Sequence, residues 1–198
     1  MKSCYFLLLS LVLASSCADD TDPTQPAAAL PDSVNSVKQY FPVLDYMRGE
    51  VRMVDSFATA IRQYVTVNGR TDSGFITPDQ FRNIMQEYLS ADLSKENFER
   101  YYMESSFFDE GTQTSTFTYS TKNDELEVHR VDVLVQGTET YDKVSSIYLE
   151  KFSANDDSSV IKKVLLRNGA SVVINSEVTK GNAAPVVRQE KLVWNDFE

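Results

Sequence analysis

Cysteine, histidine and tryptophan are scarce in this chain of 198 residues, which contains two, one and one of them. Both cysteines, Cys4 and Cys17, lie near the amino terminus, so nothing after residue 17 can form a disulfide, bind zinc through sulfur or act as a thiol nucleophile. The chain also lacks a G-x-S-x-G motif, and its single histidine is His129. These absences predict a protein that is not an enzyme and that uses neither a metal nor another cofactor.

Positive charge is the next shortage, because 19 Lys and Arg residues stand against 29 Asp and Glu residues and the net charge is −10. Nucleic acids select clustered Lys and Arg, so we expect no nucleic-acid partner. Charge does not draw such a protein to an anionic membrane surface either. Hydrophobic residues still make up 42% of the chain and aromatic residues 11%, which is enough for a folded core.

One apolar run stands out, at residues 5–14, and it follows Lys2. A run of this length is too short to cross a bilayer and is typical of a signal peptide. The next residues, Ala14-Ser15-Ser16-Cys17, resemble the lipobox of bacterial lipoproteins, with Ala14 in place of the usual Leu. The resemblance implies cleavage before Cys17 and its acylation, palmitate included. Two or three acyl chains would anchor the protein stably, whereas one binds weakly.

Residues 17–31 follow as an acidic segment with three prolines, which predicts a flexible tether. Acidic residues directly after the lipidated cysteine resemble the surface-export tag of Bacteroidetes lipoproteins, and they also resemble an inner-membrane retention signal of enterobacteria. We therefore divide the chain into a signal peptide (1–16), a lipidated cysteine with its tether (17–31) and a single domain (32–198).

Three helices are predicted in the first half of the domain. Apolar residues recur every three or four positions from Phe41 to Ile61, which indicates one amphipathic helix. Thr77-Pro78-Asp79-Gln80 has the spacing of a capping box with proline in the first turn. Ser94 opens the third helix, which ends near Met103. Between the first two, Asn68-Gly69 predicts a turn, with a short hairpin around it.

From about residue 105 the apolar period changes from 3.6 to two. Six strands are expected, at residues 114–121, 126–136, 143–153, 159–167, 171–180 and 186–194. Asn168-Gly169 predicts a two-residue type I′ turn between two of them. The expected fold class is α+β, with N-terminal helices packed on one face of a C-terminal antiparallel β-meander of about six strands.

The strand at 126–136 changes parity, because its apolar residues are even-numbered up to Val128 and odd-numbered from Val131. A β-bulge near His129-Arg130 would keep both sets on one face, and the alternative is that each half of the strand buries a different face. His129 is then a strand residue beside a bulge rather than a general base. Lys162 and Lys163 are adjacent in a strand, so one must face each side of the sheet.

Two turns carry oxygen ligands of the kind that calcium prefers, Asn123-Asp124-Glu125 and Asn155-Asp156-Asp157. Neither has the spacing of an EF-hand loop, and Asn and Asp also stabilise turns through their own hydrogen bonds. We therefore interpret both as turns.

Aromatic side chains are the remaining candidates for a site. We expect most of them to pack between helices and sheet, with a recognition surface or an apolar cleft as the alternative. The residues of this ligand or partner surface would be Tyr101, Tyr102, Phe117, Tyr119 and Tyr148.

The whole layout, from lipobox and acidic tether to helices and antiparallel sheet, resembles small lipoproteins of Bacteroidetes-type bacteria. This resemblance implies a protein that is lipid-anchored in the cell outer membrane, on its periplasmic side or at the cell surface. The first hypothesis is a non-enzymatic module that binds another envelope protein or supports an assembly. The second is a carrier of an apolar ligand, a lipid or a lipoprotein, in a half-barrel-like cleft of the sheet.

Overall fold

The computed structural model describes residues 40–136 and 144–195. Four helical elements and nine strands follow one another in this part of the chain. In order they are α1 (Val43–Phe57), β1 (Ile61–Val67), β2 (Arg70–Ile76), α2 (Pro78–Gln86), the 3-10 turn η1 (Ala91–Leu93), α3 (Lys95–Tyr101), β3 (Met103–Asp109), β4 (Thr114–Ser120), β5 (Val128–Gln136), β6 (Val144–Ala154), β7 (Ser158–Arg167), β8 (Ser171–Lys180) and β9 (Val186–Val193).

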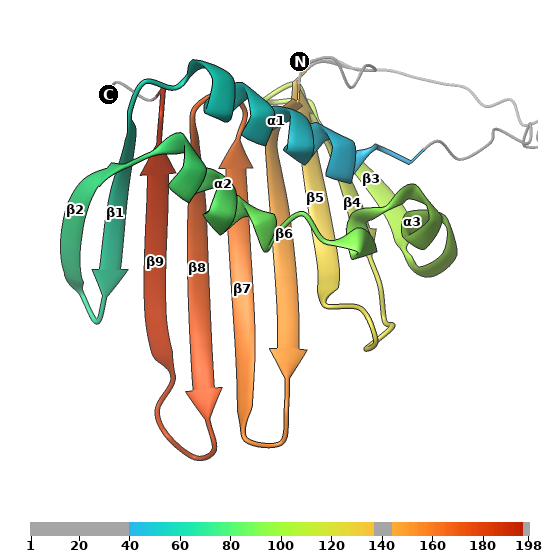
Figure 1. The fold of residues 1–198 in the computed structure, drawn as a ribbon. Coiled ribbons are helices and arrows are strands. Elements are labelled where there is room, and N and C mark those ends of the chain that lie inside the picture. Colours follow the sequence, from blue (N-terminus) through green and yellow to red (C-terminus); the bar gives the residue numbers. More distant parts are fainter. Residues whose placement is uncertain (1–39, 137–143, 196–198) are drawn as a thin grey trace, which may run out of the picture. The chain divides into compact units, whose positions relative to one another are not determined.

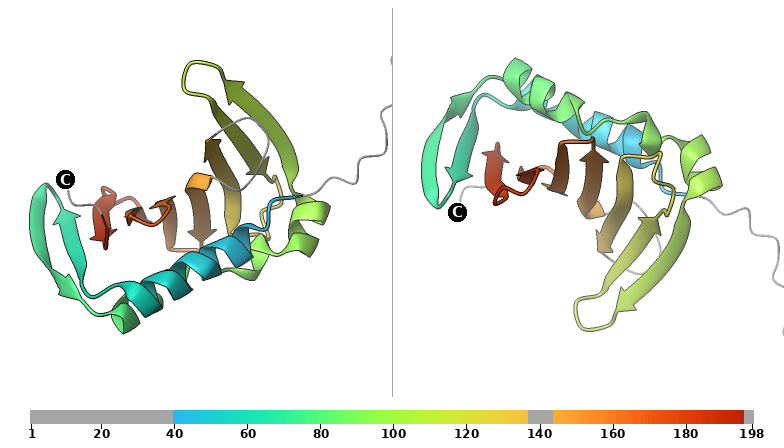
Figure 2. Two further views of the ribbon diagram at one scale, coloured as in Figure 1. Left: turned by 90° about the horizontal axis from the view of Figure 1, so that it is seen from above. Right: turned by 90° about the horizontal axis from the view of Figure 1, so that it is seen from below.

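The described strands form one antiparallel sheet in the order β2-β1-β9-β8-β7-β6-β5-β4-β3. Each strand from β3 to β9 pairs with the next strand in sequence. The β1–β2 hairpin extends the sheet beyond β9, because β1 pairs with β9. Figure 1 shows α1 and α2 lying across one face, over the upper part of the strands. We call this the helix face and the opposite side the open face. Figure 2 shows the sheet twisting, so that the β1–β2 hairpin leans to the helix side and the β3–β4 hairpin to the other side.

The α+β class and the antiparallel sheet are therefore as predicted, but the expectation of about six strands is wrong. The additional strands are β1 and β2, which form the hairpin predicted around Asn68-Gly69 and extend the sheet, and β3, which was not predicted. Strands β2 and β3 are the two edges of the sheet, and their side chains are mostly exposed. Because neither face of these strands is consistently buried, their sequences show little alternation of apolar and polar residues. The pattern that identifies a strand in sequence comes from half-burial, which edge strands largely lack.

Local sequence explains the two best-defined connections. Thr77 caps α2 as predicted: its hydroxyl accepts a hydrogen bond from the Gln80 amide (3.3 Å), and the Gln80 side chain accepts one from the Thr77 amide (2.8 Å). Asn68 and Gly69 form the two-residue β1–β2 turn with φ of 50° and 78°, as a type I′ turn requires.

The β7–β8 hairpin exists, but its turn differs from the expected type. Arg167 pairs with Ser171, so three residues form the loop, and only Gly169 among them has a positive φ, of 66°. A three-residue loop with glycine in the left-handed region is the next most common hairpin connection.

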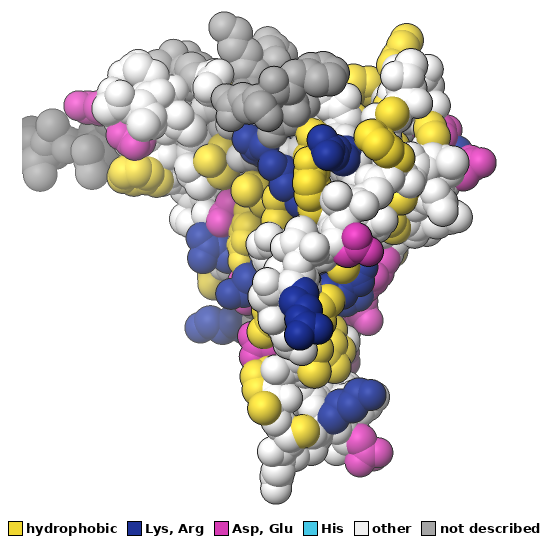
Figure 3. Space-filling model, turned by 90° about the vertical axis from the view of Figure 1, so that its left-hand side faces the viewer, with side chains coloured by type: hydrophobic (Ala, Val, Ile, Leu, Met, Phe, Trp, Pro, Cys, Tyr) yellow, Lys and Arg dark blue, Asp and Glu magenta, His cyan; other side chains and the backbone are white. Residues whose placement is uncertain are grey.

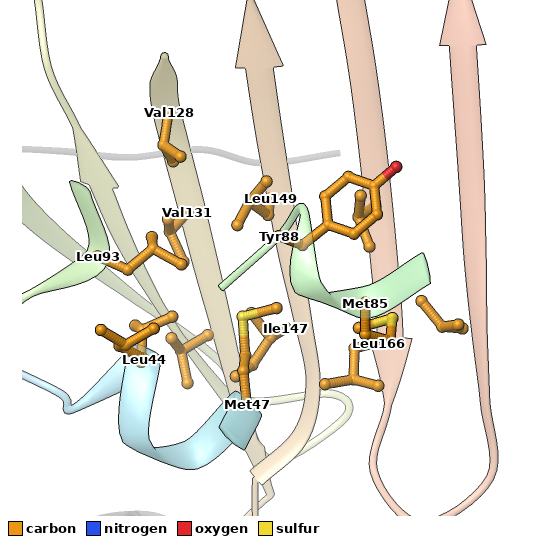
Figure 4. Close-up of a cluster of buried hydrophobic side chains, with 14 of the residues drawn as sticks. Leu44, Met47, Met85, Tyr88, Leu93, Val128, Val131, Ile147, Leu149 and Leu166 are labelled. Atoms are coloured by element: carbon orange, nitrogen blue, oxygen red, sulfur yellow. The ribbon is translucent and has the colours of Figure 1, made fainter. Parts of the chain in front are cut away.

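The core lies between the helices and the helix face. Figure 4 shows Leu44 and Met47 of α1, Met85 of α2 and Leu93 directed toward Val131, Ile147, Leu149 and Leu166 of the sheet. Most of these side chains are 2% exposed or less. Close packing of this kind fills the helix–sheet interface with protein side chains.

The parity change in β5 is resolved by a bulge, the first of the two alternatives. The pairing with β6 shifts between Val128 and Arg130, so His129 is the additional residue. Val128, Val131, Val133 and Val135 are consequently all buried on the helix face.

Helix α1 is shorter than its apolar stripe suggested. It ends at Phe57, whose side chain is 80% exposed, and Ile61 belongs to β1. The extended conformation of Ala58, with φ −73° and ψ 122°, ends the helix.

Candidate binding surfaces

The predicted lipidation site, Cys17, lies outside the described residues. Among the predicted surface aromatics, Tyr119 and Tyr102 belong to the core instead. Tyr119 is fully buried, and its hydroxyl accepts a hydrogen bond from the Phe41 amide at 3.2 Å. The Tyr102 hydroxyl donates to the Val128 carbonyl at 2.5 Å. Both rings pack on Phe98, with ring centroids 5.0 Å away for Tyr119 and 4.6 Å away for Tyr102, so neither is available to a partner.

The other three predicted aromatics are half-buried. Tyr101 and Phe117 pack against the margin of the core. Tyr148 differs, because it pairs with Asp132 and Leu165 and therefore projects from the open face. The structure thus does not gather the five predicted residues into one surface.

A polar cluster surrounds Tyr148 on the open face. The Arg130 guanidinium holds Asp132 through two contacts of Nε at 3.0 Å and one of Nη2 at 2.9 Å. Thr118 donates a hydrogen bond to the same carboxylate at 2.8 Å. The hydrogen bonds and the charge of Asp132 raise the pKa of Arg130. The Asp132 carboxylate is therefore engaged by both Arg130 and Thr118.

Tyr148 belongs to the same network as a hydrogen-bond donor. Its hydroxyl donates to Glu150 at 2.9 Å. Burial, together with the hydrogen bond to Glu150 and the charge of that carboxylate, raises the pKa of Tyr148 to about 12. The phenol is therefore protonated at neutral pH, and the cluster can bind by charge and hydrogen bonding.

Apolar side chains share the open face with this cluster. Phe152 is 38% exposed, Leu165 37% and Val187 51%. Strand register also places Ile161 and Val173 on this side. A shallow hollow of about 110 Å³ lies beside them, lined by Ile161, Lys163, Asn175, Ser176, Glu177 and Val187.

A larger hollow of about 280 Å³ lies where α1 ends. Met53, Phe57, Gly169 and Trp194 are among its lining residues. The Trp194 indole packs edge-on against Phe81, and its buried N–H has no hydrogen-bond partner among the described residues.

His129 and the two Asn-Asp turns occupy the positions that the sequence interpretation gave them. The His129 ring contacts Phe152, with centroids 5.8 Å apart. The Asn155 side-chain oxygen accepts hydrogen bonds from the amides of Asp157 (3.1 Å) and Ser158 (2.8 Å), as a turn residue does. Within the described ranges, no group of three or more His, Cys, Asp and Glu residues is arranged to hold a metal ion.

Lysine residues divide between the faces as expected, and one of them is unexpectedly buried. Lys162 faces the helices and pairs with Glu87 at 2.5 Å, whereas Lys163 lies on the open face. Lys151 is only 8% exposed, and its ammonium donates to the Glu87 carbonyl and pairs with Glu127, both at 3.0 Å. The sequence pattern indicates this burial, since Lys151 continues the inward-facing series of Ile147 and Leu149.

The β2 edge mixes cations with aromatic side chains. The Arg62 guanidinium lies 5.3 Å from the centroid of the Tyr64 ring and 5.9 Å from that of Phe75. Figure 3 views the molecule from this side and shows Lys and Arg gathered among apolar side chains.

The chain matches no family model, no curated protein and no solved structure. None of the helices in the described residues has both the length and the apolar character needed to cross a bilayer.

Proposed function

We propose that this chain is a lipid-anchored cell-envelope protein whose α+β domain is a non-enzymatic binding or assembly module. Cys17 would carry the lipid, and residues 18–31 would be the tether. Helices packed on one face of the sheet would form the structural side, and the open face would receive another envelope protein.

The observation that carries this proposal is the contrast between the two faces of the sheet. On the helix face, Leu149 and Leu166 are buried under the helices. On the open face, Phe152, Leu165 and Val187 remain 37–51% exposed. Charged groups such as Arg130 and Lys163 lie beside them, and an apolar centre with a polar margin is typical of protein interfaces.

The second hypothesis, a carrier of an apolar ligand, is less well supported. A carrier needs a deep apolar cavity, and here the interface between helices and sheet is filled by core side chains. The hollow at the end of α1, at about 280 Å³, is smaller than the ~300–1,000 Å³ of ordinary ligand pockets and lies at the periphery.

The anchor is tested by metabolic labelling with palmitate in a bacterial host. We expect label in the wild-type chain and in Cys4→Ser, and none in Cys17→Ser. Label that persists in Cys17→Ser would contradict lipidation at this residue.

The binding surface is tested with a photoreactive amino acid placed at Leu165 on the open face or, as a control, at the exposed Arg52 of α1. In the native envelope, we expect one protein adduct of fixed mass from position 165 and none from position 52. A Val187→Asp substitution should weaken that adduct. Equal adducts from both positions, or lipid adducts alone, would argue against the proposal.

A further inference from the structure

The two edges of the sheet differ in how they are protected. On β2, the Ser73 amide already donates to the Asp72 carboxylate at 2.8 Å, and Arg62 packs over Phe75 of the neighbouring strand. Side-chain capture of a backbone amide and charged side chains both discourage pairing with another strand. The β2 edge is therefore blunted.

Within the described residues, strand β3 is less protected, because its charged side chains are Glu104 and Asp109 and none of them is basic. Its sequence, Met-Glu-Ser-Ser-Phe-Phe-Asp, contains no lysine, arginine or proline. Met103 is 62% exposed and Phe107 is 68% exposed, and both lie on the open face. Figure 2 shows the β3–β4 hairpin projecting away from the helices, and β3 is the last strand of the sheet. Such an edge offers unpaired backbone groups to another strand.

We infer that β3 pairs antiparallel with β3 of a second copy of this chain, around a two-fold axis at Ser105, so that the two sheets become continuous. The pairing uses only described residues and is independent of the state of Cys17.

The side-chain pattern selects this register. A two-fold axis perpendicular to the sheet keeps each side chain on its own face, so only registers centred on a residue are allowed. Centred on Ser105, the register places Met103 opposite Phe107 of the second copy, twice in the dimer. On the other face Glu104 meets Ser106. A register centred on Glu104 would oppose two like charges, and one centred on Ser106 would place Met103 opposite Asp109.

Charge at the ends of the strand agrees with the same register. Arg100 lies in the last turn of α3, just before β3 begins, and is exposed. Asp109 and Glu110 lie where β3 ends. Antiparallel pairing brings the basic start of each strand to the acidic end of the other, which offsets part of the repulsion between two chains of net charge −10.

Disulfide trapping tests the register directly. A chain that begins at Ala18 contains every described residue and no cysteine, so one substitution gives a single thiol. We expect Ser105→Cys to form a cross-linked dimer under mild oxidation, because residues opposite each other in an antiparallel pair have Cβ atoms about 5 Å apart. Ser106→Cys should cross-link much more slowly, and Ser73→Cys on β2 reports random collisions. Equal cross-linking of Ser105→Cys and Ser73→Cys would overturn the inference.

Sedimentation velocity of the same chain measures the association itself. We expect a concentration-dependent dimer that Phe107→Lys weakens about tenfold or more, since the change occurs twice in the dimer. The matched control is Phe75→Lys, because Phe75 is 72% exposed and lies on the other edge. Circular dichroism of each variant checks that it folds. If Phe107→Lys fails to fold, the trapping result decides the matter alone.

Charge reversal tests the contact between the basic start of one β3 strand and the acidic end of the other. Arg100→Glu should weaken the dimer, and adding Glu110→Arg should restore it. A wild-type chain that stays monomeric at every concentration, or a dimer that tolerates Phe107→Lys, would overturn the pairing.

Discussion

Two neighbouring leucines in β7 allow the faces of the sheet to be compared within one strand. Leu166 is 2% exposed under the helices, and Leu165 is 37% exposed on the open face. We expect Leu166→Ala to lower the free energy of unfolding by about 3 kcal/mol, because it removes buried methyl groups and leaves a cavity. Leu165→Ala should cost about 1 kcal/mol, since it loses only part of the burial and water fills the space.

These values translate into measurable melting temperatures. For a domain of this size ~1 kcal/mol corresponds to a shift of about 2–4 °C, so we expect Tm to fall by about 6–12 °C for Leu166→Ala and about 2–4 °C for Leu165→Ala. Thermal unfolding followed by circular dichroism, on the chain that begins at Ala18, makes the comparison. Equal losses would refute the reasoning, because they would mean that the open face is packed against other parts of the protein.

Four further comparisons between variants test local features. Gly49→Ala in α1 should raise the free energy of unfolding, measured by urea titration, by about 0.5–1 kcal/mol, because a Cβ there meets nothing within 4 Å. Gly69→Ala should lower it in the same titration, because a side chain is strained at a φ of +78°. Thr77→Ala should cost about 1 kcal/mol of unfolding free energy through loss of the α2 cap, and Thr77→Ser should be close to neutral. Lys151→Met should cost about 2 kcal/mol, against less than ~0.5 kcal/mol for the open-face Lys163→Met. The pKa of Tyr148 is raised from 10.0 to about 12, so the stabilisation that its protonated phenol provides is complete below pH 10 and is lost as the pH rises toward 12. We therefore expect Tm to fall less between pH 10 and pH 12 in Tyr148→Phe than in the wild type.

Sequence patterns predicted the parts of the fold that local chemistry or half-burial determines. The capping box at Thr77 and the bulge at His129 both follow from short-range patterns, and both are present. By contrast, β3 was missed because Ser105 and Ser106 interrupt its apolar residues and its edge position leaves it exposed.

The candidate surfaces were harder to predict, because the face on which an aromatic side chain lies depends on strand register. Tyr119 and Tyr148 look alike in sequence, yet the first pairs with Val131 on the helix face and the second with Asp132 on the open face. Arg130 and Asp132 are two residues apart on β5 and so share a face, and the bulge at His129 determines that this is the open face. Such surfaces follow only from the assembled sheet.

The central claim is that the domain is a binding module with a filled core, and not a carrier. Native mass spectrometry of the chain that begins at Ala18, before and after extraction with organic solvent, tests it most directly. We expect the mass of the protein alone, as monomer or dimer, and no change on extraction. A bound lipid that is lost on extraction would contradict it and would favour the carrier.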